Sequence, residues 1–231
     1  GLRASVAVVP DLPCTPAFIM LGCMSFSSAE RARLADLLIQ LGPDAPTLCE
    51  GWDTRDMAVH LYLREHNPLA AAGMFAPPLA GQLAKASAKA GERDYPELVR
   101  DWGAGPGRFN PVRYIDPLMN TAEHFIHHED VRRGDGVARP RDLSRAVEEQ
   151  LYRALSSSAP RFLKNSTVPV ILHPTGFPRI VAADKRGVSL DGEGVLSVTG
   201  DVGELLLWVF GRDVVELTME GNPDDAIRSS L

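Results

Sequence analysis

Apolar residues recur at helical spacing between about residues 27 and 160, and this periodicity predicts a series of α-helices. Ser27 is the expected cap of the first helix. The second helix is expected to begin with a capping box, in which Asp53 is the cap and Asp56 replaces the usual Glu. Pro68 is expected to kink that helix. The predicted helices cover about 27–41, 53–72, 79–90, 96–102, 111–133 and 142–157.

After about residue 165 the pattern changes to short runs of β-type residues, with Gly and Asp at the turns between them. One buried helix is expected among them at 203–211. The chain is therefore expected to be an α+β protein of two domains, a helical bundle at 24–160 and a small α+β domain at 165–221, followed by a loose tail at 222–231. The predicted strands cover about 168–172, 180–183, 188–190, 195–198 and 214–219.

Residues 1–23 are apolar, but three prolines and an aspartate interrupt them. A secretory signal would need an unbroken apolar core and a clearer basic start. Residues 19–23 faintly resemble a lipoprotein cleavage site, which is the alternative interpretation. We expect residues 1–23 to be a non-native or disordered extension, with Met24 as the natural start.

The composition is that of an ordinary globular protein, with 45% hydrophobic and 23% charged residues in 231 positions. The net charge of −6 and the lack of basic clusters among aromatic residues argue against a nucleic-acid partner. No apolar run is long enough to suggest a membrane partner. One cysteine, Cys49, lies in the expected folded part, which fits a cytoplasmic location and excludes a disulfide framework. We expect a monomer or a homodimer.

Three of the six histidines crowd into residues 124–128, among acidic residues. Residues four apart on a helix differ by about 40° in direction, so Glu123 and His127 can hold one metal ion from one helix. Periodicity favours Glu123 over His124, which is expected to face solvent, but does not decide between His127 and His128. The pair Glu123 and His127 lies on one shoulder of the apolar stripe. The alternatives are a pair formed by His124 and His128, or a polar helix face without metal.

A third ligand from a facing helix would leave coordination positions open, as in catalytic metal sites. His60, on the predicted second helix, is the candidate, although taken alone it is better explained as a buried histidine bonded to a backbone carbonyl. Asp130 lies one turn beyond His127 and could accept its free ring N–H. The alternative for Asp130 is an ion pair with Arg132 or Arg133.

Two further side chains were considered for chemistry. Arg212 follows the buried helix and is the candidate for holding a substrate carboxylate, because a guanidinium makes a planar two-pronged contact. The alternative for Arg212 is an ordinary surface arginine at a helix end. Cys49 is expected to be structural rather than a nucleophile.

Three segments together resemble the mycothiol-dependent maleylpyruvate isomerase family, which belongs to the wider DinB-like metal-binding helical bundles. Residues 48–61 (LCEGWDTRDMAVHL) resemble its signature, and residues 198–212 (VTGDVGELLLWVFGR) resemble its sterol-carrier-like C-terminal domain. Residues 120–133 (NTAEHFIHHEDVRR) look closer to an actinobacterial branch of uncharacterised metal-binding proteins. The resemblance covers most of residues 25–220.

The resemblance implies a DinB-like four-helix bundle with His60, Glu123 and His127 as metal ligands. It implies a divalent metal, with zinc placed before nickel, iron or manganese, and a low-molecular-weight thiol of the mycothiol type. The expected function is that of a thiol transferase or isomerase, in which a metal-bound thiolate attacks a small electrophilic substrate. The alternative is a non-catalytic, metal-stabilised protein that binds a small apolar ligand.

Overall fold

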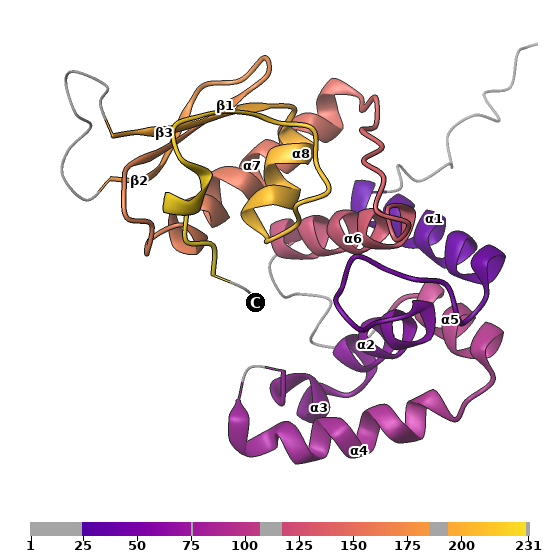
Figure 1. Ribbon diagram of the computed structural model, residues 1–231. Coiled ribbons are helices and arrows are strands. Elements are labelled where there is room, and N and C mark those ends of the chain that lie inside the picture. Colours follow the sequence, from indigo (N-terminus) through magenta and orange to yellow (C-terminus); the bar gives the residue numbers. More distant parts are fainter. Residues whose placement is uncertain (1–24, 75, 107–116, 185–193, 230–231) are drawn as a thin grey trace, which may run out of the picture.

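The computed structural model describes residues 25–74, 76–106, 117–184 and 194–229. These residues form eight α-helices and a small four-stranded sheet, so the expected α+β class is confirmed (Figure 1). None of the helices in these ranges has the length and the apolar character needed to cross a membrane. The helices are α1 (Phe26–Leu41), α2 (Thr54–His66), α3 (Pro68–Ala72), α4 (Ala80–Gly91), α5 (Tyr95–Gly103), α6 (Pro117–Arg132), α7 (Arg145–Phe162) and α8 (Val202–Val209).

The helix starts follow from local capping. The capping box of α2 is present, because Asp53 accepts from the backbone N–H of Asp56 and Asp56 accepts from that of Asp53. Helix α1 begins two residues earlier than expected, since Ser25 rather than Ser27 is its cap. Pro68 does not kink α2 but starts the separate helix α3, where its missing N–H costs nothing. A short 3₁₀ turn at Pro77–Leu79 precedes α4.

The sheet has the strand order β2-β1-β3-β4, with β1 (Val170–Pro174), β2 (Ile180–Ala183), β3 (Leu196–Gly200) and β4 (Thr218–Glu220). Strand β1 pairs in antiparallel fashion with β2 and in parallel with β3, and β4 pairs in antiparallel fashion with β3. The last strand is shorter than the predicted 214–219. The predicted strand at 188–190 and the first part of the predicted helix at 111–133 lie outside the described residues.

The buried apolar side chains of the described residues form two cores. One contains side chains of α1, α2, α4 and α5, and the other contains side chains of α7, α8 and the sheet. Helix α6 lies between them, since Phe125 belongs to the core of the sheet and Val131 to that of the helices. Helix α7, expected in the helical domain, thus packs its buried face against α8 and the sheet (Figure 1). The division into two domains stays a prediction.

The C-terminal segment is not loose as expected, at least as far as residue 229. A 3₁₀ turn at Pro223–Asp225 is followed by backbone hydrogen bonds to the helix and strand region of the sheet core. The N–H of Thr167 donates to the carbonyl of Asp225 at 2.9 Å, and the N–H of Ser229 donates to that of Phe162 at 2.9 Å. Apolar periodicity could not show these bonds, because they are made by the backbone.

Candidate metal centre

Helices α2 and α6 bring together the three side chains that the sequence proposed as metal ligands. His60 comes from α2, and Glu123 and His127 lie one turn apart on α6. The Oε1 atom of Glu123 is 3.7 Å from Nε2 of His60 and 3.8 Å from Nε2 of His127. One donor atom from each of the three residues lies within 4.8 Å of the others. We call these three residues the donor triad.

The polar side of α6 does not face solvent, in contrast to the expectation for His124. His124 is 2% exposed and His128 is 6% exposed, so neither points into solvent. The helix is packed against α1 on one side and against α7 and α8 on others, and the partners supply charges to match its polar residues. A helix enclosed in this way has no single apolar stripe, which is why periodicity misplaced these histidines.

The other two histidines of α6, His124 and His128, are buried and contact residues outside the donor triad. His128 Nδ1 lies 2.7 Å from Oε2 of Glu30, a buried residue of α1. His124 Nδ1 lies 2.8 Å from the hydroxyl of Ser27, and its Nε2 is 3.5 Å from Glu65. His124 and His128, the alternative ligand pair, therefore contact different residues from each other.

Glu123 is held so that one of its oxygens faces the imidazoles. Arg64, one turn after His60 on α2, forms an ion pair with Oε2 and leaves Oε1 toward the two Nε2 atoms. Burial alone would raise the pKa of Glu123, but His60 together with the charge of Arg64 holds it below the usual value. Sequence analysis missed Arg64. The spacing of four residues from His60 was the signal that could have found it.

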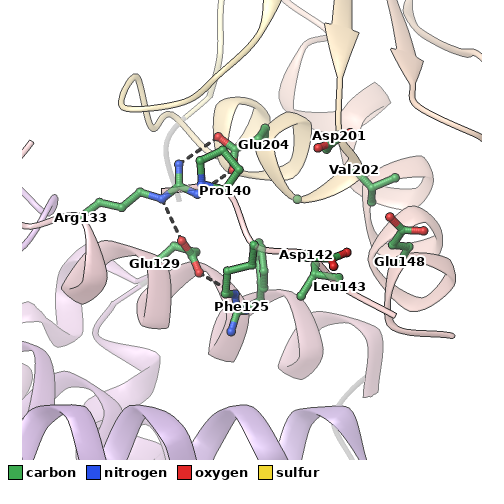
Figure 2. Close-up of a pocket in the computed structure, with 12 residues that line it drawn as sticks. Phe125, Glu129, Arg133, Pro140, Asp142, Leu143, Glu148, Asp201, Val202 and Glu204 are labelled. Atoms are coloured by element: carbon green, nitrogen blue, oxygen red, sulfur yellow. Dashed lines mark hydrogen bonds and ion pairs between the residues drawn. The ribbon is translucent and has the colours of Figure 1, made fainter. Parts of the chain in front are cut away.

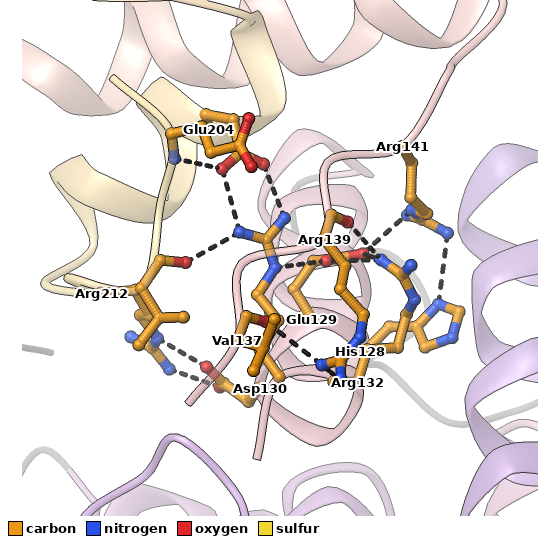
Figure 3. A network of polar contacts seen from close by, with 12 residues as sticks. His128, Glu129, Asp130, Arg132, Val137, Arg139, Arg141, Glu204 and Arg212 are labelled. Atoms are coloured by element: carbon orange, nitrogen blue, oxygen red, sulfur yellow. Dashed lines mark hydrogen bonds and ion pairs between the residues drawn. The ribbon is translucent and has the colours of Figure 1, made fainter. Parts of the chain in front are cut away.

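His127 is oriented from its other ring nitrogen. Its Nδ1 lies 3.0 Å from Oδ2 of Asp130, which is the contact expected for a residue that fixes the ring of a metal ligand. Asp130 is fully buried, and its second partner is Arg212, with Nε 2.8 Å from Oδ1 and Nη2 2.6 Å from Oδ2. The alternative partners considered for Asp130 were Arg132 and Arg133, and both instead contact Glu129 (Figure 3).

Arg212 has its two-pronged contact within the protein. The Nε and Nη2 atoms bind Asp130, and Nη1 donates to the carbonyl of Phe210 at 2.6 Å. Burial by itself would raise the pKa of Asp130, but Arg212 and His127 hold it well below its usual range. In this structure Arg212 therefore orients Asp130. To hold a substrate carboxylate as well, Arg212 would have to use N–H groups that these contacts do not occupy.

Cys49 lies beside these residues and forms a second donor group with His127 and Asp130. Burial, together with the negative charge of Asp130, raises the pKa of its thiol to about 12, so the thiolate is scarce at neutral pH. Nη2 of Arg212 is 3.8 Å from its Sγ and 2.6 Å from Asp130, so an internal cation already stands where a metal would have to bind. This agrees with a structural role for Cys49.

The donor triad fits a divalent cation. In a tetrahedral zinc site, the ligand atoms lie about 2.0–2.1 Å from the ion and roughly 3.3 Å from one another. The observed separations of 3.7 and 3.8 Å would reach this value after small rotations of the side chains. Burial lowers the pKa of His60 against the opposing effect of Glu123, which keeps the imidazole neutral and able to donate its lone pair. The side chains of the triad are 12–19% exposed, so they are not completely closed off from solvent.

A cavity of about 270 Å³ lies on another side of α6 and does not include the donor triad (Figure 2). Ion pairs join four of its charged lining residues, namely Glu129, Arg133, Arg141 and Glu204. Arg133 contacts Glu129 at 2.8 Å and Glu204 of α8 at 2.6 Å. Arg141 contacts Glu129 at 2.9 Å (Figure 3). It also contacts Glu30 at 2.8 Å. These residues bind α6 to its neighbours, and we call them the buried ion-pair set, namely Glu30, His128, Glu129, Arg133, Arg141 and Glu204.

The fold and the site define an α+β protein in which two helices present two imidazoles and one carboxylate to one point. No protein-family model matches the chain, and no curated protein matches its sequence. Among solved structures, the chain is similar to that of a mycothiol-dependent maleylpyruvate isomerase, with a TM-score of 0.57 at 13% identity, over 88% of this chain and 92% of the other. A histidine-to-alanine mutant of a mycothiol-dependent maleylpyruvate isomerase is similar over the same shares, with a TM-score of 0.56 at 13% identity. The likeness shows a shared fold and a distant structural relationship.

Proposed function

We propose that this protein is a divalent-metal-dependent thiol transferase or isomerase that acts on a small electrophilic substrate. The observation that carries the proposal is the convergence of His60, Glu123 and His127 from two helices, within 4.8 Å. The likeness in fold to a mycothiol-dependent isomerase supports a thiol, of the mycothiol type, as cosubstrate.

The donor triad would hold the cation through Nε2 of each imidazole and Oε1 of the carboxylate. Two nitrogens and one oxygen suit zinc best, while nickel, iron and manganese also accept such a set. A cation bound there supplies the positive charge that lowers the pKa of a thiol and so makes thiolate available at neutral pH.

The neighbouring residues keep the donors in place. Arg64 fixes the carboxylate of Glu123, and Asp130 fixes the imidazole of His127. Arg212 holds Asp130 from the far side, so a residue after α8 stabilises the position of a ligand on α6. We therefore assign Arg212 first to positioning, and binding of a substrate carboxylate becomes its second role.

The reaction balances without an oxidant or reductant. In the isomerase case, thiolate sulfur forms a bond to an electrophilic carbon of a conjugated C=C–C=O group, and the π electrons move to the carbonyl oxygen as an enolate. Rotation about the former double bond follows. The enolate then re-forms the double bond and expels the thiolate unchanged. In the transferase case, the C–S bond stays and either a proton is taken up at carbon or a leaving group departs with its electron pair.

Metal analysis together with a thiol-transfer assay tests the proposal. We expect one zinc or related ion per chain in the purified protein, and we expect His60→Ala to lose both the ion and the turnover. His66→Ala is the matched control, because His66 is exposed on the same helix and its Nδ1 lies 3.0 Å from the carbonyl of Tyr62. The absence of metal, with unchanged activity in His60→Ala, would disprove the proposal. Tight thiol binding without turnover would favour a binding protein.

A further inference from the structure

Trp52 is an exposed aromatic residue beside the donor triad. Its ring centroid is 5.2 Å from that of His60, and the two rings are inclined by 53°. The side chain is 37% exposed, whereas Trp102 and Trp208 are 0% and 3% exposed. Among the described residues, Trp52 is the one aromatic member of the exposed large hydrophobic side chains. One side of the indole therefore faces a candidate metal ligand while much of the ring stays open.

The loop that carries Trp52 is held firmly. The N–H of Trp52 donates to the carbonyl of Cys49 at 3.0 Å, and its own carbonyl accepts from the hydroxyl of Thr47 at 2.9 Å. The next residue, Asp53, is the cap of α2. The backbone of Trp52 is thus fixed relative to α2, and the contact with the ring of His60 limits the positions of the indole.

The same loop is anchored to α6. The N–H of Leu48 donates to the carbonyl of Asp130 at 3.0 Å. At the end of α6, a Cβ on Gly134 would come within 2.0 Å of the carbonyl oxygen of Pro46, so only glycine allows the loop to lie so close. Both helices that supply the donor triad therefore also fix the position of Trp52.

We propose that Trp52 is a specificity-determining residue, on whose indole face a planar conjugated substrate lies. This inference rests on the proposed function. Thiolate addition and elimination require a carbon–carbon double bond conjugated with a carbonyl or carboxylate group, and such a group is flat with an exposed π system. Offset stacking on an indole favours flat π systems over saturated chains of equal length.

Charge at the site supports an acidic form of such a substrate. A bound divalent cation and the two arginines Arg64 and Arg212 carry four positive charges, whereas the carboxylates of Glu123 and Asp130 carry two negative charges. A conjugated carboxylate would therefore be attracted to the loaded site, with its flat part over Trp52.

The test uses the fluorescence of Trp52, because the other two tryptophans are buried. Cobalt(II) is added first, and it is expected to quench the emission of the wild-type protein but not that of His60→Ala. Sorbate, a flat diene carboxylate, is then titrated without thiol into the cobalt-loaded protein, with binding followed by calorimetry, and hexanoate, its saturated counterpart, serves as comparison. We expect sorbate to bind at least fivefold more tightly than hexanoate.

The variant Trp52→Ala is expected to lose this preference when binding is followed by calorimetry, while cobalt affinity stays within twofold. Trp52→Phe is expected to keep part of the preference, since it retains an aromatic face. Val181→Ala is the control, because Val181 is 38% exposed on strand β2 of the sheet. Equal binding of sorbate and hexanoate to the wild type, or an unchanged preference in Trp52→Ala, overturns the inference. A lack of cobalt binding instead overturns the proposed function.

Discussion

The three imidazoles of α6 lie in two kinds of environment. His127 faces an open site that it shares with His60 and Glu123, at separations longer than a hydrogen bond. His128 instead has a hydrogen-bonded carboxylate, Glu30 at 2.7 Å, and His124 lies 2.8 Å from the hydroxyl of Ser27 with Glu65 at 3.5 Å. Arginines pair with both carboxylates. One helix thus carries a candidate cation site and sites, which we call the closed sites, whose charges are balanced within the protein.

The difference teaches how the same residue types can serve binding or folding. At the closed sites, Arg141 contacts Glu30 and Arg31 contacts Glu65, so a cation of the protein already neutralises each carboxylate. At the donor triad, Arg64 takes one oxygen of Glu123 and leaves the other free to face the imidazoles. The number of His, Asp and Glu residues nearby does not distinguish the donor triad from the closed sites. The positions of the arginines do distinguish them.

The largest effect is expected from breaking the buried ion-pair set. Arg133→Met leaves Glu204 buried without its cation and removes one of the three arginine partners of Glu129, so we expect the free energy of unfolding to fall by about 3–5 kcal/mol. Arg145→Met, which removes an exposed ion pair on α7, should change it by less than about 1 kcal/mol. Urea unfolding of the metal-free protein measures both. Equal losses in the two variants would contradict the distinction between buried and exposed pairs.

Neighbouring histidines on α6 should separate binding from stability. His127→Ala is expected to lower zinc affinity by more than about 100-fold, because it removes a ligand rather than a supporting residue. His128→Ala should leave zinc affinity nearly unchanged but reduce stability by about 1–3 kcal/mol, since Glu30 loses a buried partner. Calorimetric titration with zinc and thermal unfolding give the two quantities. A stronger effect of His128→Ala on zinc affinity would reverse the assignment of the sites.

Asp130 offers a finer test of the open site. Asp130→Asn keeps the shape of the side chain but removes the charge that orients His127 and binds Arg212. We expect zinc affinity to fall by about 10–100-fold, as for other residues that hold a ligand in place. Asp135→Asn is the control, because Asp135 is exposed and its cation is Arg139, outside the site. Unchanged zinc affinity in Asp130→Asn would show that His127 does not need this support.

The pH dependence of stability offers a further test of the closed sites. Hydrogen bonds and the positive charges of their partners outweigh burial and lower the pKa values of Glu30 and Glu65 to about 2 from 4.5. A carboxylate with a lowered folded pKa stabilises the fold above its unfolded pKa, and this contribution is lost as the pH falls toward the folded value. Stability should therefore decline between about pH 4.5 and 2.

Glu65→Gln should flatten this decline, which urea unfolding at several acidic pH values can follow. Glu149→Gln, on the exposed side of α7, should keep the slope of the wild type. An unchanged slope in Glu65→Gln would mean that the ion pair with Arg31 does not contribute to stability in this range.

Local sequence patterns were sufficient for much of the fold. The capping box at Asp53 fixed the start of α2, and the spacing of Glu123 and His127 was enough to place both on one side of α6, because these are relations within a few residues. The α+β class also followed from the change of apolar period near residue 165. Patterns could not show that the tail to residue 229 packs on the sheet core, since its backbone and side-chain contacts are made with residues distant in the sequence.

The sequence by itself determined which residues could act as donors and which helices would carry them. Only the tertiary structure decided their partners: that His60 meets Glu123, that Arg212 reaches Asp130 across 82 positions, and that His124 and His128 are buried. The physical reason is that charge pairing acts through space. A helix enclosed by α1, α7 and α8 takes its polar partners from distant segments, which no local periodicity records.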